Sequence, residues 1–532
     1  MLIRDVAYQH LPRRARADRH QRAATWLQSL PADRSDDRAE LLAHHWQAAY
    51  QYALASRQPT SGLALSTRLA LRAAGDRALS LNNYEGADRW YSGALELWPH
   101  DNADRPLLLL RLGEAQLQGG ANGGPILAEA ADRLLADGDV EGAAEAYRLR
   151  GMLLHRQGKA TAAGEMFQRA LALLSDRGPS KIRAAILGEL ARHLSLTGHP
   201  DDAFRTGTEA LHLAEELDLS DQAALAYCVL GNLRIEMGEA SGIADLERAV
   251  GIALKSNYVE TAAMYGDLAN ALIVLGDLRR GFALQERARE SARRFGVVHI
   301  LRHLEVERIV QDYLQGDWKS ASQRCRDFIV GVESGSPHDV ADVCWQVRAL
   351  MGLGNGTLPE AMSDAQRAAE LGIALGYTQA LLPNFAVHAR ALFANGRVTE
   401  AQARVDELLA ANPGQRAPCN PDWCGSLAFV LHDLARGEEF MTAVPRVHRT
   451  NPWVIAAQAI AEGKFTQAAD EYAAIGSVAD EAYARLRAGE QLVVDGQGVE
   501  AVEHLKCAAD FFGRAGALAY LSAAEDLLRR AK

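Results

Sequence analysis

Residues 151–170 read GMLLHRQGKATAAGEMFQRA, in which a turn at Gly158-Lys159 is followed five positions on from the glycine by the small residue Ala163. A small residue then returns every 39 or 40 positions through half of the chain, at Ala163, Ala203, Gly242, Gly281, Ala321, Ala361 and Ala401. A fixed period of this size is typical of helical hairpins stacked side by side. The spacing therefore predicts an all-α solenoid.

A glycine followed by a polar residue precedes most of these small residues and marks the predicted turn within each hairpin. The pairs are Gly158-Lys159, Gly198-His199, Gly238-Glu239, Gly276-Asp277, Gly316-Asp317 and Gly396-Arg397. Such pairs are strong local signals for a break between helices. Each repeat is therefore expected to hold two helices joined by a short turn.

Other repeat positions also hold recurring residue types. The tetratricopeptide consensus order of small, aromatic and proline residues is met at Gly75, Ala78, Ala87, Tyr91, Ala94 and Pro99, and again in part at Gly151, Leu154, Ala163, Phe167 and Ala170. Leu230-Gly231-Asn232 marks another first helix, and Gly489, Ala501, Leu505 and Ala508 mark the last hairpin. The chain resembles the tetratricopeptide family over roughly residues 65–532, although its period is near 40 and not 34. The resemblance implies a right-handed α-solenoid of about twelve hairpins, with three N-terminal helices as a cap.

Breaks in the repeat register divide the chain into four predicted segments. Residues 1–60 form the N-terminal helical segment, with helices expected over 3–11, 13–30 and 36–55. The main array follows over 61–411, a loop-rich break with an irregular hairpin over 412–450, and the last hairpins over 451–532. Loop signals rich in glycine, asparagine and proline at 119–125 and 412–421 are the basis of this division.

Composition narrows the classes of function. The formal charge of −11 argues against general affinity for nucleic acid, whose phosphates need clustered cations. The six cysteines lack framework spacing, as in a reduced cytosolic protein, and no signal peptide or membrane span is evident. We expect a cytoplasmic, soluble protein without a cofactor.

The N-terminal strings IRDVAY (3–8), LPRRARA (11–17), RHQRAA (19–24) and AELLAHHW (39–46) carry a second resemblance. This segment is similar to the junction that ends the ATPase module and leads into the repeats of actinobacterial signalling ATPases. The resemblance implies a sensor or scaffold half of a protein linked to an adenylate/guanylate cyclase, or to a DNA-binding regulator. The phosphate loop Gly-x-x-x-x-Gly-Lys-Ser/Thr is missing from the sequence, so we expect no enzyme activity. A regulatory part of an adenylate/guanylate cyclase or ATPase, or of a repeat-containing transcriptional regulator, stays open as an alternative.

Two surfaces are candidates for partner binding. Arg13, Arg14, Arg16 and Arg19 form a basic run that could dock an ATPase module or an acidic partner, or could simply be solvated. The inner face of the first helices is predicted to form a peptide-binding groove. By register it includes Arg148, His155, Arg192, Asn232, Asn270, Tyr313, Gln346, Arg390 and Phe393. The partner would be a protein or peptide, and neither nucleic acid nor membrane.

Metal sites receive little support from spacing. His44 and His45 are adjacent on a predicted helix and point about 100° apart, so a structural role is favoured over a shared ligand. Cys419 and Cys424, with His432 and His448 downstream, lie at the loose limit of zinc-site spacing, and free thiols are favoured there. The sequence therefore predicts no metal centre.

Overall fold

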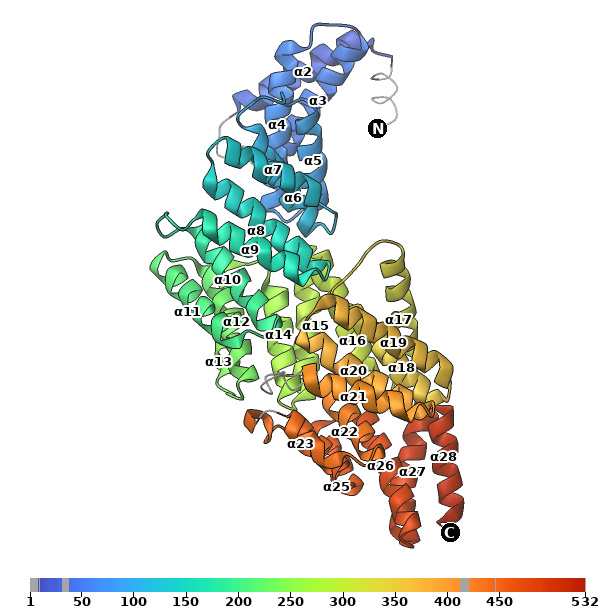
Figure 1. Ribbon diagram of the computed structural model, residues 1–532. Helices are drawn as coiled ribbons and strands as arrows, with labels where there is room; N and C mark the ends of the chain where they lie inside the picture. Colours follow the sequence, from blue (N-terminus) through green and yellow to red (C-terminus); the bar gives the residue numbers. More distant parts are fainter. Residues whose placement is uncertain (1–7, 9, 31–37, 412–420, 445, 532) are drawn as a thin grey trace. The chain divides into compact units, whose positions relative to one another are not determined.

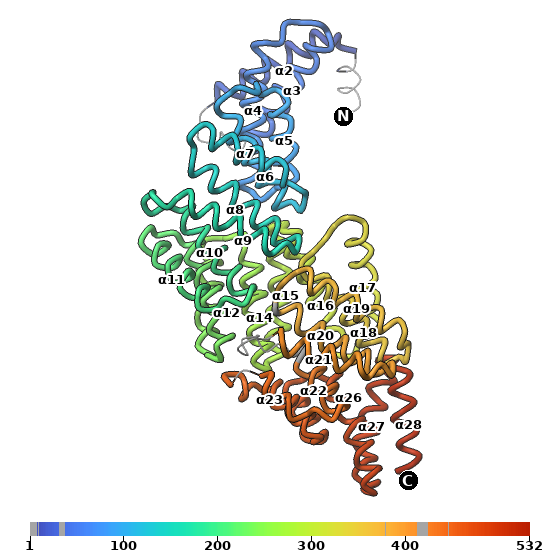
Figure 2. Tube along the Cα trace, in the orientation of Figure 1, coloured from blue at the N-terminus to red at the C-terminus, as the bar shows by residue number. Residues whose placement is uncertain are grey.

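The computed structural model describes residues 8, 10–30, 38–411, 421–444 and 446–531, and every regular element within them is a helix. Figures 1 and 2 show the helices following one another as antiparallel neighbours along the chain. The described chain contains 27 α-helices, which is close to the predicted dozen hairpins. The predicted all-helical solenoid is confirmed.

The N-terminal helices begin with two from the predicted cap. The first predicted helix, over 3–11, lies largely outside the described residues, whereas the next two are present. The helices up to residue 156 are α2 (Arg13–Ser29), α3 (Ala39–Ala55), α4 (Ser61–Ser80), α5 (Tyr84–Glu96), α6 (Arg105–Gln118), α7 (Gly124–Ala136) and α8 (Val140–Arg156).

The repeats continue with long helices up to the second predicted break. These are α9 (Ala160–Leu173), α10 (Lys181–Leu196), α11 (Pro200–Glu216), α12 (Ser220–Glu236), α13 (Gly242–Ser256), α14 (Thr261–Val274), α15 (Leu278–Phe295), α16 (Val298–Gln315), α17 (Trp318–Glu333), α18 (Asp342–Asn355), α19 (Leu358–Leu375), α20 (Thr378–Ala394) and α21 (Val398–Ala411).

The segment after residue 420 starts irregularly and ends in regular hairpins. It contains α22 (Pro421–Asp433), the short turns η3 (Gly437–Glu439), α23 (Phe440–Ala443) and η4 (Arg446–His448), and then α24 (Pro452–Ala461), α25 (Phe465–Ile475), α26 (Val478–Val494), α27 (Gly498–Ala515) and α28 (Leu518–Arg530). Of the predicted loop at 412–421, residues 412–420 lie outside the described residues, and the last residue begins α22.

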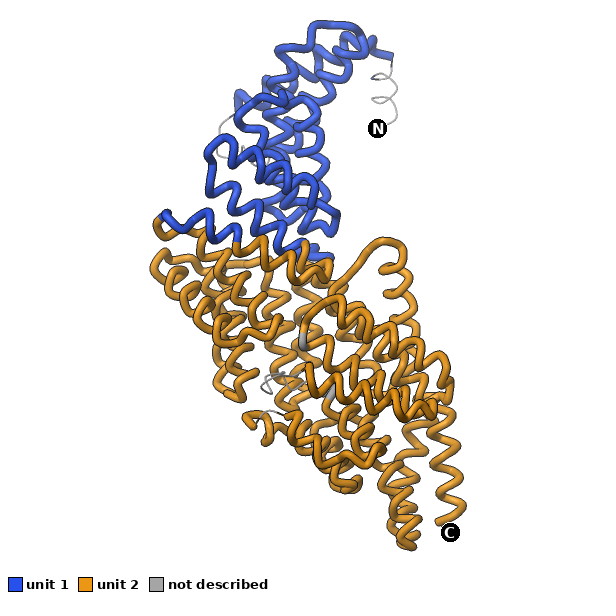
Figure 3. The backbone as a smooth tube through the Cα atoms, in the orientation of Figure 1, with its two compact units in different colours: residues 1–153, 169–177, 295–298 blue, residues 154–168, 178–294, 299–532 orange. Residues whose placement is uncertain are grey.

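The chain folds into two units that Figure 3 distinguishes by colour. Unit 1 comprises residues 1–153, 169–177 and 295–298, and unit 2 comprises 154–168, 178–294 and 299–532. The division passes through α8 and α9, where the sequence shows no break in register. The other loop signal, at 119–125, proves to be short, because Gly124 and Pro125 already form the first turn of α7. Proline is well suited to that place, since its missing N–H has no partner to lose there.

All six predicted turn glycines adopt left-handed backbone. Their φ angles lie between 73° and 88°, at Gly158, Gly198, Gly238, Gly276, Gly316 and Gly396. Side chains other than that of glycine are strained in this region, and a helix commonly ends on such a residue. The glycine pattern therefore identified the helix ends correctly.

Small residues also permit close crossing of the two helices of a hairpin. A Cβ atom added at Gly75 would lie 2.5 Å from the ring of Tyr91, and one at Gly113 would lie 2.5 Å from Leu127. At Gly489 the added atom would lie 2.4 Å from Leu505. The glycine on the first helix thus makes room for the large side chain of the second.

A second feature of the hairpin, which the sequence analysis did not identify, is an arginine stacked on an aromatic ring. The guanidinium of Arg169 lies 4.5 Å from the ring centroid of Tyr147, and that of Arg248 lies 4.4 Å from Tyr227. The same pairing of second-helix arginine with first-helix ring recurs for Arg287 on Tyr265, Arg367 on Trp345 and Arg404 on Phe385. Such contacts combine cation–π attraction with burial of the arginine stem.

Helices of unit 2 that are far apart in sequence are in contact. Trp453 Nε1 donates to the carbonyl oxygen of Ile273 at 2.8 Å, and Asn451 Nδ2 donates to that of Val274 at 2.7 Å. These carbonyls belong to the last turn of α14, where the helical partner four residues further on is missing. Side chains at the start of α24 therefore complete the end of a helix about 180 residues earlier.

None of the described helices is both long enough and apolar enough to cross a membrane.

Candidate functional site

Several residues of the predicted groove are engaged within the chain. Arg148 pairs with Glu145 at 2.7 Å, and both side chains are mostly covered. Arg192 pairs with Glu189 at 2.6 Å but keeps 40% of its side chain exposed. Both contacts join residues three apart on one helix, so the arginine is held along its own helix surface.

Two of the predicted groove residues are buried. Gln346 is only 3% exposed and His155 only 7% exposed. The hydroxyl of Tyr377 lies 2.8 Å from His155 Nδ1, although the two residues are 222 positions apart. Burial lowers the pKa of His155 to about 4, so its imidazole is neutral at pH 7. In this structure neither side chain is available to a partner.

The two predicted groove asparagines differ in their surroundings. Asn270 is exposed, whereas Asn232 is half-buried and hydrogen-bonds to the carboxylate of Asp267. The thiol of Cys228 also donates to that carboxylate, with Sγ 2.9 Å from Oδ2. Asn232 is therefore already used within the chain, and Asn270 is open.

The remaining three groove residues lie against the C-terminal hairpins of unit 2. The Arg390 guanidinium stacks over the rings of Phe429 and Tyr483, at 5.0 and 4.4 Å. Tyr313 and Phe393 pack against the apolar cluster that α22, α24 and α25 help to build. Repeat register placed these residues on one face, but it gave no sign that a later hairpin covers that face.

The predicted N-terminal patch lies on α2. Among the described helices, α2 packs mainly against α3. Arg13, Arg14 and Arg19 are exposed. Arg16 differs, because its guanidinium stacks over the rings of Tyr8 and Tyr52 and its Nε donates to the carbonyl of Leu11 at 3.0 Å. Three of the four predicted arginines are thus free to meet a partner, and the fourth has a packing role.

An exposed tryptophan on the same helix was missed in the sequence analysis. Trp26 lies on α2 and keeps 61% of its surface exposed. The buried residues of α2 are Ala17, Ala24 and Leu27, whose spacing of seven and three follows one helix face. Trp26 falls off that face, so the signal was present in the sequence.

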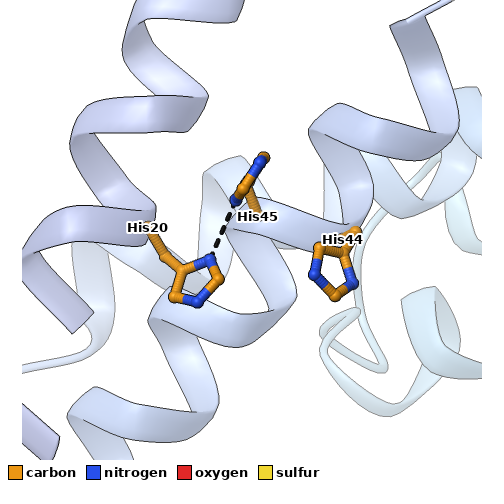
Figure 4. A group of neighbouring side chains, drawn as sticks. All are labelled: His20, His44 and His45. Carbon is orange, nitrogen blue, oxygen red and sulfur yellow. Dashed lines mark hydrogen bonds between the residues drawn. The ribbon is translucent and has the colours of Figure 1, made fainter. Parts of the chain in front are cut away.

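The structure also brings a third histidine to the adjacent pair on α3. Figure 4 shows His20, from α2, beside His44 and His45, with a dashed line joining His20 to His45. That contact is 2.8 Å between the two Nδ1 atoms. Three imidazoles from two helices therefore meet here, with one nitrogen of each within 4.8 Å of the others. The interpretation of His44 and His45 from sequence did not include this third ring.

A second group, in unit 2, joins His299, His338 and Asp339. The two rings stack with centroids 4.4 Å apart, and His338 Nε2 lies 3.1 Å from the backbone oxygen of His299. His338 Nδ1 lies 2.9 Å from a carboxylate oxygen of Asp339. Both nitrogens of His338 are thus already engaged by the protein.

The loosely spaced zinc alternative is not assembled by the described residues. Cys419 lies outside them. Cys424 is buried in the apolar cluster of α22, and the ring of His432 packs edge-on against Phe465. None of the five described cysteines, which are Cys228, Cys325, Cys344, Cys424 and the exposed Cys507, forms a disulfide.

Comparison with known proteins supports the repeat assignment. Residues 142–216 match the family described as "Tetratricopeptide repeat". No curated protein matches the chain.

Three solved structures illustrate the extent of structural similarity. A Rap protein complexed with competence and sporulation factor is 14% identical, with TM-score 0.42, covering 74% of this chain and 98% of that one. The Cut9 complex with Hcn1, an APC/C hetero-tetramer, is 16% identical, with TM-score 0.39 and coverage of 89% and 98%. A signal-transduction ATPase with a tetratricopeptide repeat sensor, from Pyrococcus horikoshii, is 12% identical, with TM-score 0.33 and coverage of 72% and 54%. Scores this low carry no information about partners.

Proposed function

We propose that this chain is a non-catalytic interaction scaffold or sensor in a cytoplasmic bacterial signalling assembly, and that it docks an acidic protein partner through α2. The observation that carries the proposal is the exposed side of α2, which presents Arg13, Arg14 and Arg19 and, seven residues after Arg19, Trp26. The helix holds five arginines and one aspartate in a chain whose net charge is −11. The positive charge is therefore concentrated on this helix. A local charged patch favours association with a partner of opposite charge, whereas the net charge of the chain mainly affects its solubility.

The composition of this face is that of an interaction surface. Tryptophan and arginine are the residues most enriched where binding energy concentrates, because each combines apolar area with a directed polar group. Arg16 contributes indirectly, since its stacking on two tyrosines holds the first turn of α2. The resemblance of residues 3–46 to an ATPase-to-repeat junction suggests an ATPase or cyclase module, in cis or in trans, as that partner.

The proposal is tested with the full chain as bait in a cross-linking pull-down from a bacterial extract. The triple variant R13E/R14E/R19E is expected to lose the acidic proteins that the wild type captures, with affinity lowered at least about tenfold, because like charges then face each other. A matched control, K181E/K255E/K319E, makes the same change in charge at exposed lysines on or beside other helices. Equal capture by both variants would contradict docking through α2.

The alternative function is that of a regulatory part of an adenylate/guanylate cyclase, an ATPase or a repeat-containing transcriptional regulator. The N-terminal strings at 3–46 favour it. Nucleotide hydrolysis and cyclase assays separate it from an independent enzyme, and we expect no turnover from the chain alone. Turnover that depends on an added partner would support a regulatory role.

A further inference from the structure

Three imidazole rings from two helices converge at the N-terminal end of unit 1. His20 lies on α2, and His44 and His45 lie on α3 (Figure 4). The ring centroid of His45 is 5.1 Å from that of His20 and 5.4 Å from that of His44. No carboxylate or thiol belongs to this group of potential ligands among the described residues.

The contact between His20 and His45 joins two nitrogens of the same kind. At 2.8 Å between the Nδ1 atoms, one nitrogen has to carry a proton and the other has to present its lone pair. A metal ion that replaces this proton would be faced by both lone pairs. Zinc–nitrogen bonds of about 2.1 Å at tetrahedral angles place two nitrogens about 3.4 Å apart. Small rotations of the two rings are enough to open the observed contact to that separation.

The protonation states of the rings suit ligation. Burial is the main cause that lowers the pKa of His20, and the neighbouring His45 and His44 rings lower it further. Burial is also the main cause that lowers the pKa of His45, with a smaller contribution from His44. Both rings are therefore neutral near pH 7, which is the form that binds metals.

A phenol orients the ring of His20 from its other side. The Tyr8 hydroxyl oxygen lies 2.6 Å from His20 Nε2, and the ring of Tyr52 stacks on His20 with centroids 5.8 Å apart. If Nδ1 binds a metal, Nε2 carries the proton and donates it to the Tyr8 oxygen. Metal-bound histidines usually donate their second nitrogen in this way, which fixes the tautomer and the ring.

We propose that His20, His44 and His45 form a binding site for a divalent late transition metal, typified by Zn²⁺, that ties α2 to α3. An all-imidazole set favours Zn²⁺, Ni²⁺ or Cu²⁺ over Mg²⁺ or Ca²⁺, which prefer oxygen ligands. His44 is exposed, so the site faces solvent on that side and a further coordination position is open to water.

The test uses the full chain, stripped with a chelator and titrated with Co²⁺ and Zn²⁺. Co²⁺ is expected to give the visible bands of a tetrahedral nitrogen site, without a thiolate charge-transfer band, at one equivalent. Zn²⁺ affinity is measured by competition with a chromophoric chelator. Because loss of a ligand removes a metal–nitrogen bond, H20Q and H44A are each expected to weaken Zn²⁺ binding at least about tenfold.

The controls separate this site from other histidines and from misfolding. His44 is exposed, so H44A is expected to keep the wild-type circular dichroism spectrum and melting curve. H212A removes an exposed histidine elsewhere, and H299A removes one member of the second group; both are expected to bind as the wild type does. The proposal is overturned if the wild type binds no Zn²⁺ at micromolar concentration. It is equally overturned if H20Q and H44A retain full affinity while H299A loses it.

Discussion

The carboxyl group of Asp342 is buried at the first turn of α18, where the residue is only 3% exposed. Its Oδ2 accepts a hydrogen bond of 2.7 Å from Asn384 Nδ2 on α20. Burial raises the pKa of Asp342 to about 7, against an opposing effect of the bond from Asn384. The protein therefore holds this side chain as a neutral acid at moderately low pH, and ionises it in a dry environment at high pH.

Substituting Asp342 by asparagine should make the protein less sensitive to pH. A carboxyl whose pKa is higher in the folded than in the unfolded state binds more protons when folded, so stability falls as pH rises from about 4 to about 7. D342N, which can still accept from Asn384, is expected to be more stable than the wild type at pH 8, by at most about 4 kcal/mol. The difference should vanish near pH 4.

Chemical denaturation at pH 4, 6 and 8 measures this effect. The comparison between variant and wild type cancels the opposite contribution of His155 and His388, whose pKa values are lowered to about 4 by burial. A stability difference that stays constant over this pH range would show that Asp342 does not titrate as proposed.

At the scale of the helical element, the crossing of α4 and α5 depends on a missing side chain. The ring of Tyr91 is fully buried against Gly75, and its hydroxyl donates to Asp76 at 2.8 Å, so the ring cannot move aside freely. G75A is expected to destabilise the protein by about 1–3 kcal/mol through overpacking. Gly251, on α13, has nothing within 4 Å of an added Cβ atom. G251A is expected to stabilise by up to about 1 kcal/mol, because alanine is the better helix former.

Thermal melting of the two variants tests this pair. The melting temperature should fall for G75A and stay equal or rise for G251A. A rise of similar size in both would mean that helix propensity, and not the crossing, decides the effect.

Elements of this kind were predictable because their causes are local. The turn glycines and the crossing glycines recur in many of the hairpins, where left-handed backbone or a close neighbour calls for them. The stacking of second-helix arginines on first-helix aromatic rings was predictable in principle, since the pair Tyr147 and Arg169 recurs as Tyr227 and Arg248. Arg13, Arg14 and Arg19 of α2 are exposed and Arg16 is stacked on tyrosines, and a docking role for these arginines stays a prediction.

At the scale of the whole molecule, the sequence contained no signal for the contacts between distant hairpins. These contacts depend on how the array of unit 2 curves. They include the stacking of Arg390 on Phe429 and Tyr483, and the contact of His155 with Tyr377. Curvature is the sum of small rotations between neighbouring repeats, and no single residue encodes it. His20 was not assigned to the pair on α3 for a more local reason, because the way α2 crosses α3 decides which of their side chains meet.

These distant contacts should make unit 2 more cooperative than a simple linear array. The ring of Phe511, on α27, meets Trp318 of α17 edge-on with centroids 6.2 Å apart, and Phe511 is 3% exposed. F511A is expected to lower the free energy of unfolding by about 3–5 kcal/mol. Hydrogen exchange should accelerate in α17 as well as in α26–α28.

The neighbouring residue supplies the control. Phe512 is 1% exposed and its ring contacts Tyr520 of α28, at 5.2 Å between centroids. F512A should therefore accelerate exchange mainly in the last three helices. Unchanged exchange in α17 for F511A would show that only adjacent repeats are coupled.

The arginines that clasp aromatic rings have a consequence for how the chain can be modified. Only seven of its 57 basic residues are lysines, and none occurs before Lys159. A guanidinium keeps its charge at any pH at which proteins fold, and a compact, strongly hydrated ammonium does not replace its flat face. Enzymes and reagents that acylate amines will therefore find few targets on this protein. Alkaline solution will leave the charge of the arginines stacked on aromatic rings unchanged.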